Sequence, residues 1–178
     1  VAYEFYKKHP KETLIVVTAD HETGGIALGT GKYALNLKAL ENQKASAEVL
    51  SKKISDLRKA KNNHVAWEDI KNLLSEEMGF WSVLPITWEQ EKKLRDEYEK
   101  SFVRNKVEFA ESMYAKTEPM AAKAKEVMDQ IAMVGWTSGG HSAGYVPVFA
   151  IGAGSDLFIG KMDNTEIPKR IAKAGGYK

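Results

Sequence analysis

The chain has 178 residues, enough for one domain with its own hydrophobic core. Its 26 basic and 24 acidic side chains leave a formal net charge of +2, and no apolar run spans a bilayer, so neither a nucleic-acid surface nor a membrane span is expected. The sequence contains no cysteine, which excludes disulfides and thiolate ligands and leaves His, Asp and Glu to hold any metal.

The first part of the chain predicts a helix, a strand and a polar loop. Residues 1–8 are typical of the end of a helix. The run Leu14–Val17 is apolar and rich in β-branched residues, which is typical of a short strand buried on both faces. Residues 18–25 form a loop at the carboxyl end of that strand. Alternating apolar residues between positions 33 and 37 predict a further short strand.

The middle part, residues 36–133, is predicted to be helical because apolar residues recur at spacings of three and four. The two clearest apolar stripes are Ala47, Leu50, Ile54 and Leu57, and then Trp67, Ile70, Leu73, Leu74 and Met78. Gly79 is expected to end the second helix, and Thr87 with Gln90 forms a capping box for the third. Pro119 can begin the last helix. The mixed charges of this part are typical of solvated helix faces.

The final part of the chain is predicted to return to an α/β arrangement. Residues 146–152 form a second apolar run that predicts a buried strand, and residues 164–176 predict a short basic helix. About a hundred residues separate the two strands, which is far more than an ordinary crossover helix needs. The predicted organisation is a core α/β segment at 1–35, a helical insertion at 36–133 and a closing α/β segment at 134–178.

Asp20 and His21 come directly after the first predicted strand, where ligand sites of open α/β sheets lie. Such neighbours can converge only where the chain turns, and Gly24 and Gly25 permit that turn. A carboxylate beside an imidazole suits zinc. A polar turn in which Asp20 caps backbone amides is the alternative that spacing alone leaves open. Glu22 is either a partner for an imidazole or a solvated side chain.

His141 is the second candidate ligand, because it follows two glycines and precedes further small residues at a strand edge. Small neighbours allow the backbone and a ligand to approach each other closely. A solvated histidine in a surface loop is the alternative interpretation. His9 and His64 lie among Lys, Pro and Asn, and both are interpreted as solvated.

Four segments, in this order, resemble segments of the alkaline phosphatase family. Val17–Gly25 resembles the segment that ends a core strand and donates Asp and His to one zinc ion. Trp136–Gly144 resembles the later segment whose His binds the other zinc ion. Val146–Gly152 and Phe158–Ile167 match the strand that follows and the closing segment. The helical middle corresponds to a region where this family carries variable insertions.

The resemblance implies an α/β fold, specifically part of a three-layer core sheet with a large helical insertion. It makes Asp20 and His21 the expected ligands of one zinc ion and His141 the expected ligand of another. The implied reaction is phosphomonoester hydrolysis through a phosphoserine intermediate, with the two zinc ions clamping the attacking and leaving oxygens. The magnesium ligands are expected outside this chain, and the protein is expected to be periplasmic or secreted.

The sequence departs from the family pattern in four respects. Thr23 stands where some members carry a second His, and Ser142 stands where Thr is frequent. The Asp-Ser pair of the nucleophile is absent, and so is the Asp-x-x-x-His pattern of the other zinc ligands. Since the chain also starts at Val1 without Met, we expect a carboxyl-terminal fragment that is inactive alone. Its expected partners are the missing amino-terminal part and, in a homodimer, a second copy.

Two other interpretations remain open at this point. The first is a phosphodiesterase or metal-dependent mutase of the same superfamily, although the closing segment Asn164–Ile167 favours the monoesterase. The second is a free-standing helical binding module with a metal-free core. The zinc content of a longer protein separates the module from the enzymes, and activity on monoesters against diesters separates the two enzymes.

Overall fold

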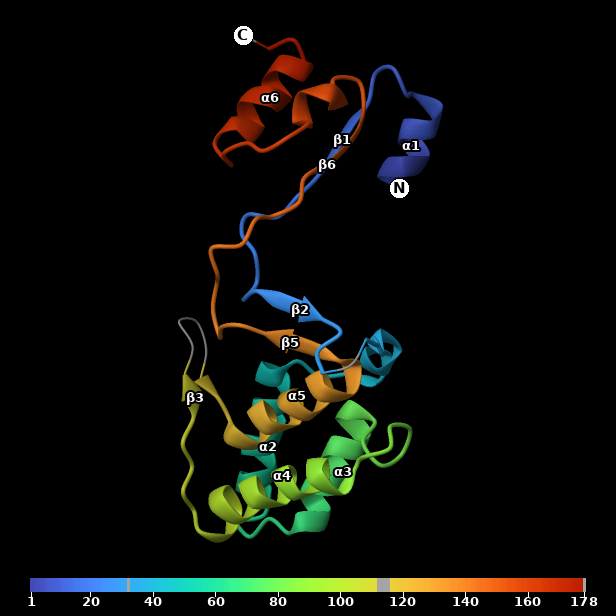
Figure 1. Ribbon diagram of the computed structural model, residues 1–178. Helices are drawn as coiled ribbons and strands as arrows, with labels where there is room; N and C mark the ends of the chain where they lie inside the picture. The colour runs from blue at the N-terminus through green and yellow to red at the C-terminus, as the bar shows by residue number, and fades with distance from the viewer. Residues whose placement is uncertain (32, 112–115, 178) are drawn as a thin grey trace. The chain divides into compact units, whose positions relative to one another are not determined.

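The computed structural model describes residues 1–31, 33–111 and 116–177, and the chain divides into two compact units. One unit combines the two ends of the chain, Val1–Gly25 and His141–Lys178. The other is the continuous segment Ile26–Gly140. We call them the terminal unit and the helical unit, and Figure 1 labels most of their helices and strands. The mixed helix and strand content predicted from the sequence is confirmed.

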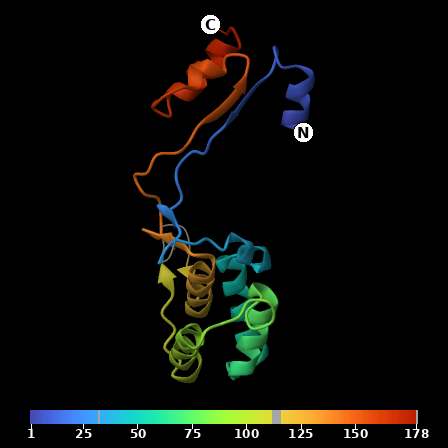
Figure 2. The same ribbon diagram turned by 45° about the vertical axis from the view of Figure 1, so that its right-hand side comes forward.

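A two-stranded antiparallel sheet forms the centre of the terminal unit. Strand β1 (Leu14–Val17) pairs along its whole length with β6 (Phe149–Gly152), and the two run side by side in Figures 1 and 2. The unit is completed by α1 (Ala2–Lys8), the 3-10 helix η3 (Ser155–Phe158) and α6 (Glu166–Ala174). These elements confirm the helix, strand, strand and helix predicted in the first and last parts of the sequence.

Strand β6 is shorter than the apolar run that predicted it. Pro147 has no backbone N–H to donate to a strand ladder, and pairing begins two residues later at Phe149. At the other end, Gly152 has a φ of 103°, and a Cβ there would collide with the carbonyl oxygen of Thr13. The usable strand is therefore limited to four residues.

The two faces of the β1–β6 sheet differ in how well they are covered. Residues opposite each other share a face, so Val17, Phe149 and Ile151 lie together, and these residues are 58%, 64% and 38% exposed. On the other face, Leu14 and Val16 help to line a groove of 530 Å³ beside α6. The prediction that β1 is buried on both faces is therefore wrong for this chain, because no residue of β1 or β6 is buried by the described residues.

The helical unit holds most of the helices. They are η1 (Leu37–Asn42), α2 (Ala47–Ala60), α3 (Trp67–Met78), α4 (Trp88–Tyr98), the π-helical η2 (Glu99–Val103) and α5 (Pro119–Ala132). Two antiparallel strand pairs are β2 (Ile26–Leu28) with β5 (Val134–Trp136), and β3 (Ala110–Glu111) with β4 (Lys116–Thr117). The strand predicted at 33–37 is wrong, since Leu37 begins η1 and the strand of this region is β2.

The helix boundaries of this unit follow local capping signals. Gly79 ends α3 with a φ of 70°, as predicted. The Thr87 hydroxyl accepts the Gln90 N–H and the Gln90 side chain accepts the Thr87 N–H, which confirms the capping box of α4. Pro119 occupies the first position of α5, as predicted.

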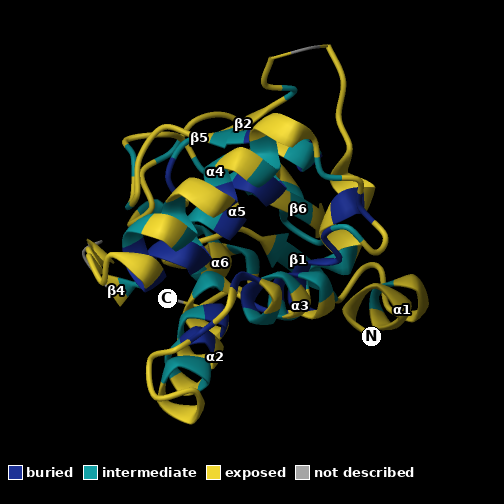
Figure 3. Cartoon of the chain, turned by 90° about the horizontal axis from the view of Figure 1, so that it is seen from below, coloured by how far each residue is buried: buried dark blue, intermediate teal, exposed yellow. Residues whose placement is uncertain are grey.

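The apolar stripes of these helices pack into one core. Members of this core that are at most 1% exposed include Leu50, Ile54, Ile70, Leu74, Phe80, Leu94, Met120, Val127 and Met128. Buried segments appear in dark blue along the helices in Figure 3. The terminal unit contributes one apolar side chain, Phe158, to the buried set among the described residues. Most of the hydrophobic stabilisation of the described chain therefore lies in the helical unit.

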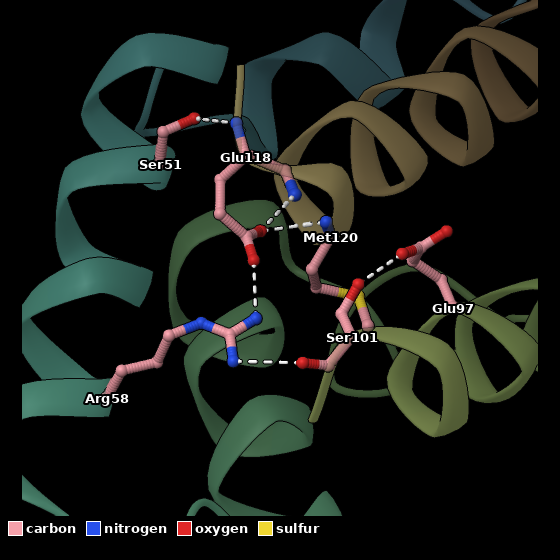
Figure 4. Close-up of polar contacts among 7 residues, drawn as sticks. Ser51, Arg58, Glu97, Ser101, Glu118 and Met120 are labelled. Atoms are coloured by element: carbon pink, nitrogen blue, oxygen red, sulfur yellow. Dashed lines mark hydrogen bonds and ion pairs between the residues drawn. The ribbon is translucent and has the colours of Figure 1, made fainter. Parts of the chain in front are cut away.

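Arg58 and Glu118 form an ion pair inside the helical unit (Figure 4). Arg58 Nη2 lies 2.8 Å from Glu118 Oε1, and Nη1 donates to the carbonyl oxygen of Ser101 at 3.1 Å. The other carboxylate oxygen, Oε2, accepts the backbone N–H groups of Met120 and Ala121. Glu118 thus caps α5 and, through Arg58, ties that helix to α2 and η2.

Candidate metal centre

The segments that carry Asp20 and His141 leave the β1–β6 sheet at the same end. β1 ends at Val17, which pairs with Phe149, the first residue of β6. Because the strands are antiparallel, the residues after β1 and the residues before β6 emerge side by side. The structure thereby brings the segment of Asp20 and His21 and the segment that begins at His141 together within the terminal unit.

The candidate ligands lie close to one another. The imidazole rings of His21 and His141 stack with their centroids 3.5 Å apart and their planes at 24°. Nε2 of His21 lies 3.5 Å from Oδ2 of Asp20. The Asp20 side chain is 87% exposed and that of His21 is 41% exposed, so both groups are accessible.

The tautomer of His21 follows from its hydrogen bond to the backbone. Nδ1 lies 2.5 Å from the carbonyl oxygen of Glu22, which can only accept, so Nδ1 carries the proton. In the neutral imidazole, Nε2 then presents its lone pair toward the side of Asp20. A backbone carbonyl that holds one ring nitrogen while the other stays available is the arrangement usual for metal-ligating histidines.

The donor types fit zinc, but their number is small. A carboxylate oxygen and an imidazole nitrogen are both zinc ligands, and a catalytic zinc normally takes three protein ligands. Across residues 1–31, 33–111 and 116–177, no group of three or more His, Cys, Asp or Glu side chains is arranged to hold a metal ion. Asp20 and His21 therefore form at most part of a site. His9 and His64 are exposed, as predicted.

Glu22 is a partner for an imidazole through its backbone carbonyl oxygen, and its side chain has a different role. Its carboxylate accepts the backbone N–H groups of Ser142, Gly24 and Gly25. These hydrogen bonds, with that from Ser142 the strongest, outweigh partial desolvation and lower the pKa of Glu22 from 4.5 to about 2. The sequence signal for this arrangement is the glycine pair that follows Glu22, since backbone N–H groups in a turn readily bind a carboxylate.

The closing segment of the chain lies next to the candidate metal centre. A cleft of 460 Å³ is lined by Asp20 and, from the segment before α6, by Asn164 and Thr165. The Asp163 carboxylate accepts the N–H and the hydroxyl of Thr165, and these bonds lower the pKa of Asp163 below 3.8. The cleft therefore has Asp20, a candidate ligand, on one side. On the other side lies the segment before α6, which the hydrogen bonds between Asp163 and Thr165 hold in place.

Comparison with known proteins shows one consistent family. The family model described as Alkaline phosphatase matches residues 1–177. Alkaline phosphatase 3 of Bacillus subtilis (strain 168) is 32% identical across 99% of this chain and 33% of that protein. Alkaline phosphatase 4 of the same strain is 28% identical across 97% of this chain and 31% of that protein. The chain thus spans about a third of the length of the curated relatives it matches.

Solved structures show the same fold. The crystal structure of a cold-active alkaline phosphatase from a psychrophilic Shewanella species matches 97% of this chain and 36% of that chain, with a TM-score of 0.63 and 24% identity. The Thermus thermophilus alkaline phosphatase matches 98% of this chain and 36% of that chain, with a TM-score of 0.61 and 22% identity. The α/β fold class predicted from the sequence is confirmed.

Proposed function

This chain belongs to the alkaline phosphatase family, and from that premise we propose that it is the carboxyl-terminal part of a phosphomonoesterase with a two-zinc, phosphoserine mechanism. The observation that supports this most strongly is the convergence of Asp20, His21 and His141 at one end of the β1–β6 sheet. Side chains of a type that binds zinc, from segments far apart in the sequence, thus lie close together, as ligands of a pair of metal ions would.

Each candidate ligand has a distinct role in this proposal. The Asp20 carboxylate and Nε2 of His21 contribute to one zinc site, and His141 contributes to the other. The Glu22 carbonyl oxygen keeps the proton of His21 on Nδ1, so that Nε2 is available as a ligand. When bound, the zinc ions supply Lewis-acid stabilisation to the oxygens that enter and leave phosphorus.

The rest of the apparatus is proposed to lie outside this chain. It includes the nucleophilic serine, the remaining zinc ligands and the magnesium ligands. The open face at Val17, Phe149 and Ile151 supports an amino-terminal partner, since that part of the protein would cover it. The outer edges of β1 and β6 would likewise gain neighbouring strands. We also propose a second copy of the protein as a partner, in a homodimer.

Two other features belong to the same proposal. The segment 36–133 is proposed to be an insertion on the α/β core formed by 1–35 and 134–178. A periplasmic or secreted location is proposed from the family alone. In the described part of the chain, no helix has both the length and the apolar character needed to cross a membrane.

The test of this function uses the full-length protein that contains this segment. We expect it to hold zinc and to hydrolyse p-nitrophenyl phosphate much faster than bis(p-nitrophenyl) phosphate. A preference for the diester would replace the monoesterase assignment with the phosphodiesterase. A folded full-length protein without zinc and without either activity would overturn the enzymatic proposal and leave the binding module.

A further inference from the structure

Glu22 contacts both of the loops that carry candidate metal ligands. Its Oε1 accepts the N–H of Gly24 at 3.0 Å and the N–H of Ser142, and its Oε2 accepts the N–H of Gly25. Gly24 and Gly25 belong to the loop of Asp20 and His21, whereas Ser142 follows His141 directly. One side chain therefore joins two segments that lie more than a hundred residues apart in the sequence.

The backbone of Glu22 adds a second connection. Its carbonyl oxygen accepts the Nδ1 proton of His21 at 2.5 Å. The main chain of Glu22 thus orients His21, while its carboxylate holds Ser142, the residue next to His141. The stacked arrangement of His21 on His141 is consistent with both connections acting together.

From this geometry we propose that Glu22 is a positioning residue. It holds the His21 loop and the His141 loop in a fixed position relative to each other, so that the ligands of both zinc sites are placed at the same time. The inference rests on the function proposed above. Glu22 is not assigned as a zinc ligand, because its two oxygens already accept backbone N–H groups from both loops.

The chemistry of the contact requires a glutamate. Glutamine offers one acceptor oxygen, and its NH₂ group would face a backbone N–H, so at least one of the three hydrogen bonds would be lost. Aspartate keeps the charge but is one methylene shorter, so it cannot reach all three N–H groups from the same backbone position. Gly144 provides the space, since a Cβ there would lie 3.3 Å from Cγ of Glu22.

The hydrogen bonds of the Glu22 carboxylate to the two loops are called the Glu22 bridge below. The first test measures this bridge directly, without metal and without an activity assay. Amide hydrogen exchange of the 178-residue chain, resolved by ¹⁵N NMR, is compared for the parent, Glu22→Gln and Glu22→Asp. We expect the Ser142 amide to exchange at least about tenfold faster in both variants, because its acceptor is no longer charged in Glu22→Gln and is one methylene farther away in Glu22→Asp. Glu12→Gln is the matched control, since Glu12 is exposed in the same unit and should leave Ser142 unchanged.

Amide protection along β1 and β6 shows in the same spectra whether the terminal unit is still folded. If that protection is kept and Ser142 exchanges at the parent rate in Glu22→Gln, the positioning role is wrong. If β1 and β6 lose protection in Glu22→Gln, that variant has unfolded the terminal unit. The exchange rate of Ser142 is then compared between the parent and the milder Glu22→Asp, which retains the charge. A parent rate at Ser142 in Glu22→Asp would then overturn the proposal.

The second test links the bridge to the proposed function in the full-length protein. We expect Glu22→Gln to weaken zinc binding at both sites together, each by about 10- to 100-fold, as for other residues that orient metal ligands. A loss confined to one site would contradict the coupling. The full-length parent could instead bind no zinc while Ser142 still exchanges faster in Glu22→Gln. That result would refute the proposed function and still support the positioning role of Glu22.

Discussion

The rings of His21 and His141 stack with their centroids 3.5 Å apart, although they come from opposite parts of the chain. The loops that carry the proposed ligands of two different zinc ions are therefore in direct contact with each other. The antiparallel pairing of β1 with β6 is the structural cause of this proximity.

The first prediction separates the two proposed zinc sites. In the full-length protein, His141→Ala should release one zinc ion and retain the other, whereas His21→Ala should affect the opposite site. The reason is that each histidine is proposed to serve a different ion. Zinc content by inductively coupled plasma mass spectrometry, combined with titration calorimetry, measures this. His64→Ala is the control, because His64 is exposed in the helical unit. Parent-like zinc binding in both ligand variants would refute the assignment.

The second prediction concerns the 178-residue chain by itself. It should hydrolyse phosphomonoesters at no measurable rate, because Asp20 and His21 provide two ligands for one zinc ion and His141 provides one for the other. No serine follows an aspartate to act as the nucleophile. The assay uses added zinc and magnesium. A turnover of about ten per second, typical of enzymes, that is abolished by His21→Ala would show that the chain is catalytically complete.

The third prediction is that the helical insertion is dispensable for zinc binding. Leu28 pairs with Val134 in the antiparallel β2–β5 ladder, so a two-residue Asn-Gly turn can replace the insertion together with the seven residues before it, 29–133 in all, and close a hairpin. In the full-length protein this deletion should retain both zinc ions and some turnover, because none of the proposed ligands is removed. A folded deletion protein that has lost all zinc would contradict the prediction, whereas altered substrate access would not.

The fourth prediction concerns the stability of the helical unit. Glu118→Gln should lower the free energy of unfolding by about 3 kcal/mol, because it leaves the Arg58 charge without its partner in a mostly buried position. All four tryptophans lie in the helical unit, so urea unfolding followed by tryptophan fluorescence reports on that unit. Glu48→Gln on the exposed side of α2 should change the stability by less than about 0.5 kcal/mol. Equal stability of the two variants would show that the ion pair contributes little.

The fifth prediction addresses the open face of the β1–β6 sheet. Phe149→Ser should reduce self-association of the 178-residue chain, because it removes a large apolar side chain that is 64% exposed. Analytical ultracentrifugation over a range of concentrations measures the effect. Val83→Ser, at a 68% exposed position of the helical unit, is the control and should have less influence. A parent chain that stays monomeric at all concentrations would show that this face does not associate.

The sequence alone was sufficient for the parts of the fold that depend on near neighbours. Apolar spacing identified α2 and α3, and the capping box at Thr87 and Gln90 identified the start of α4. The short strand at Leu14–Val17 and the family resemblance were also readable from the sequence. These features depend on residues within a few positions of one another, or on motifs whose order survives in the chain.

How distant segments meet could not be read from the sequence. The register of β1 on β6 depends on two segments more than a hundred residues apart, and no local signal in either one specifies its partner. The contact of His21 with His141 and the hydrogen bond from Ser142 to Glu22 both follow from that register. Exposure of Val17 was likewise mispredicted, because burial depends on which elements cover a strand and not on the strand's own composition.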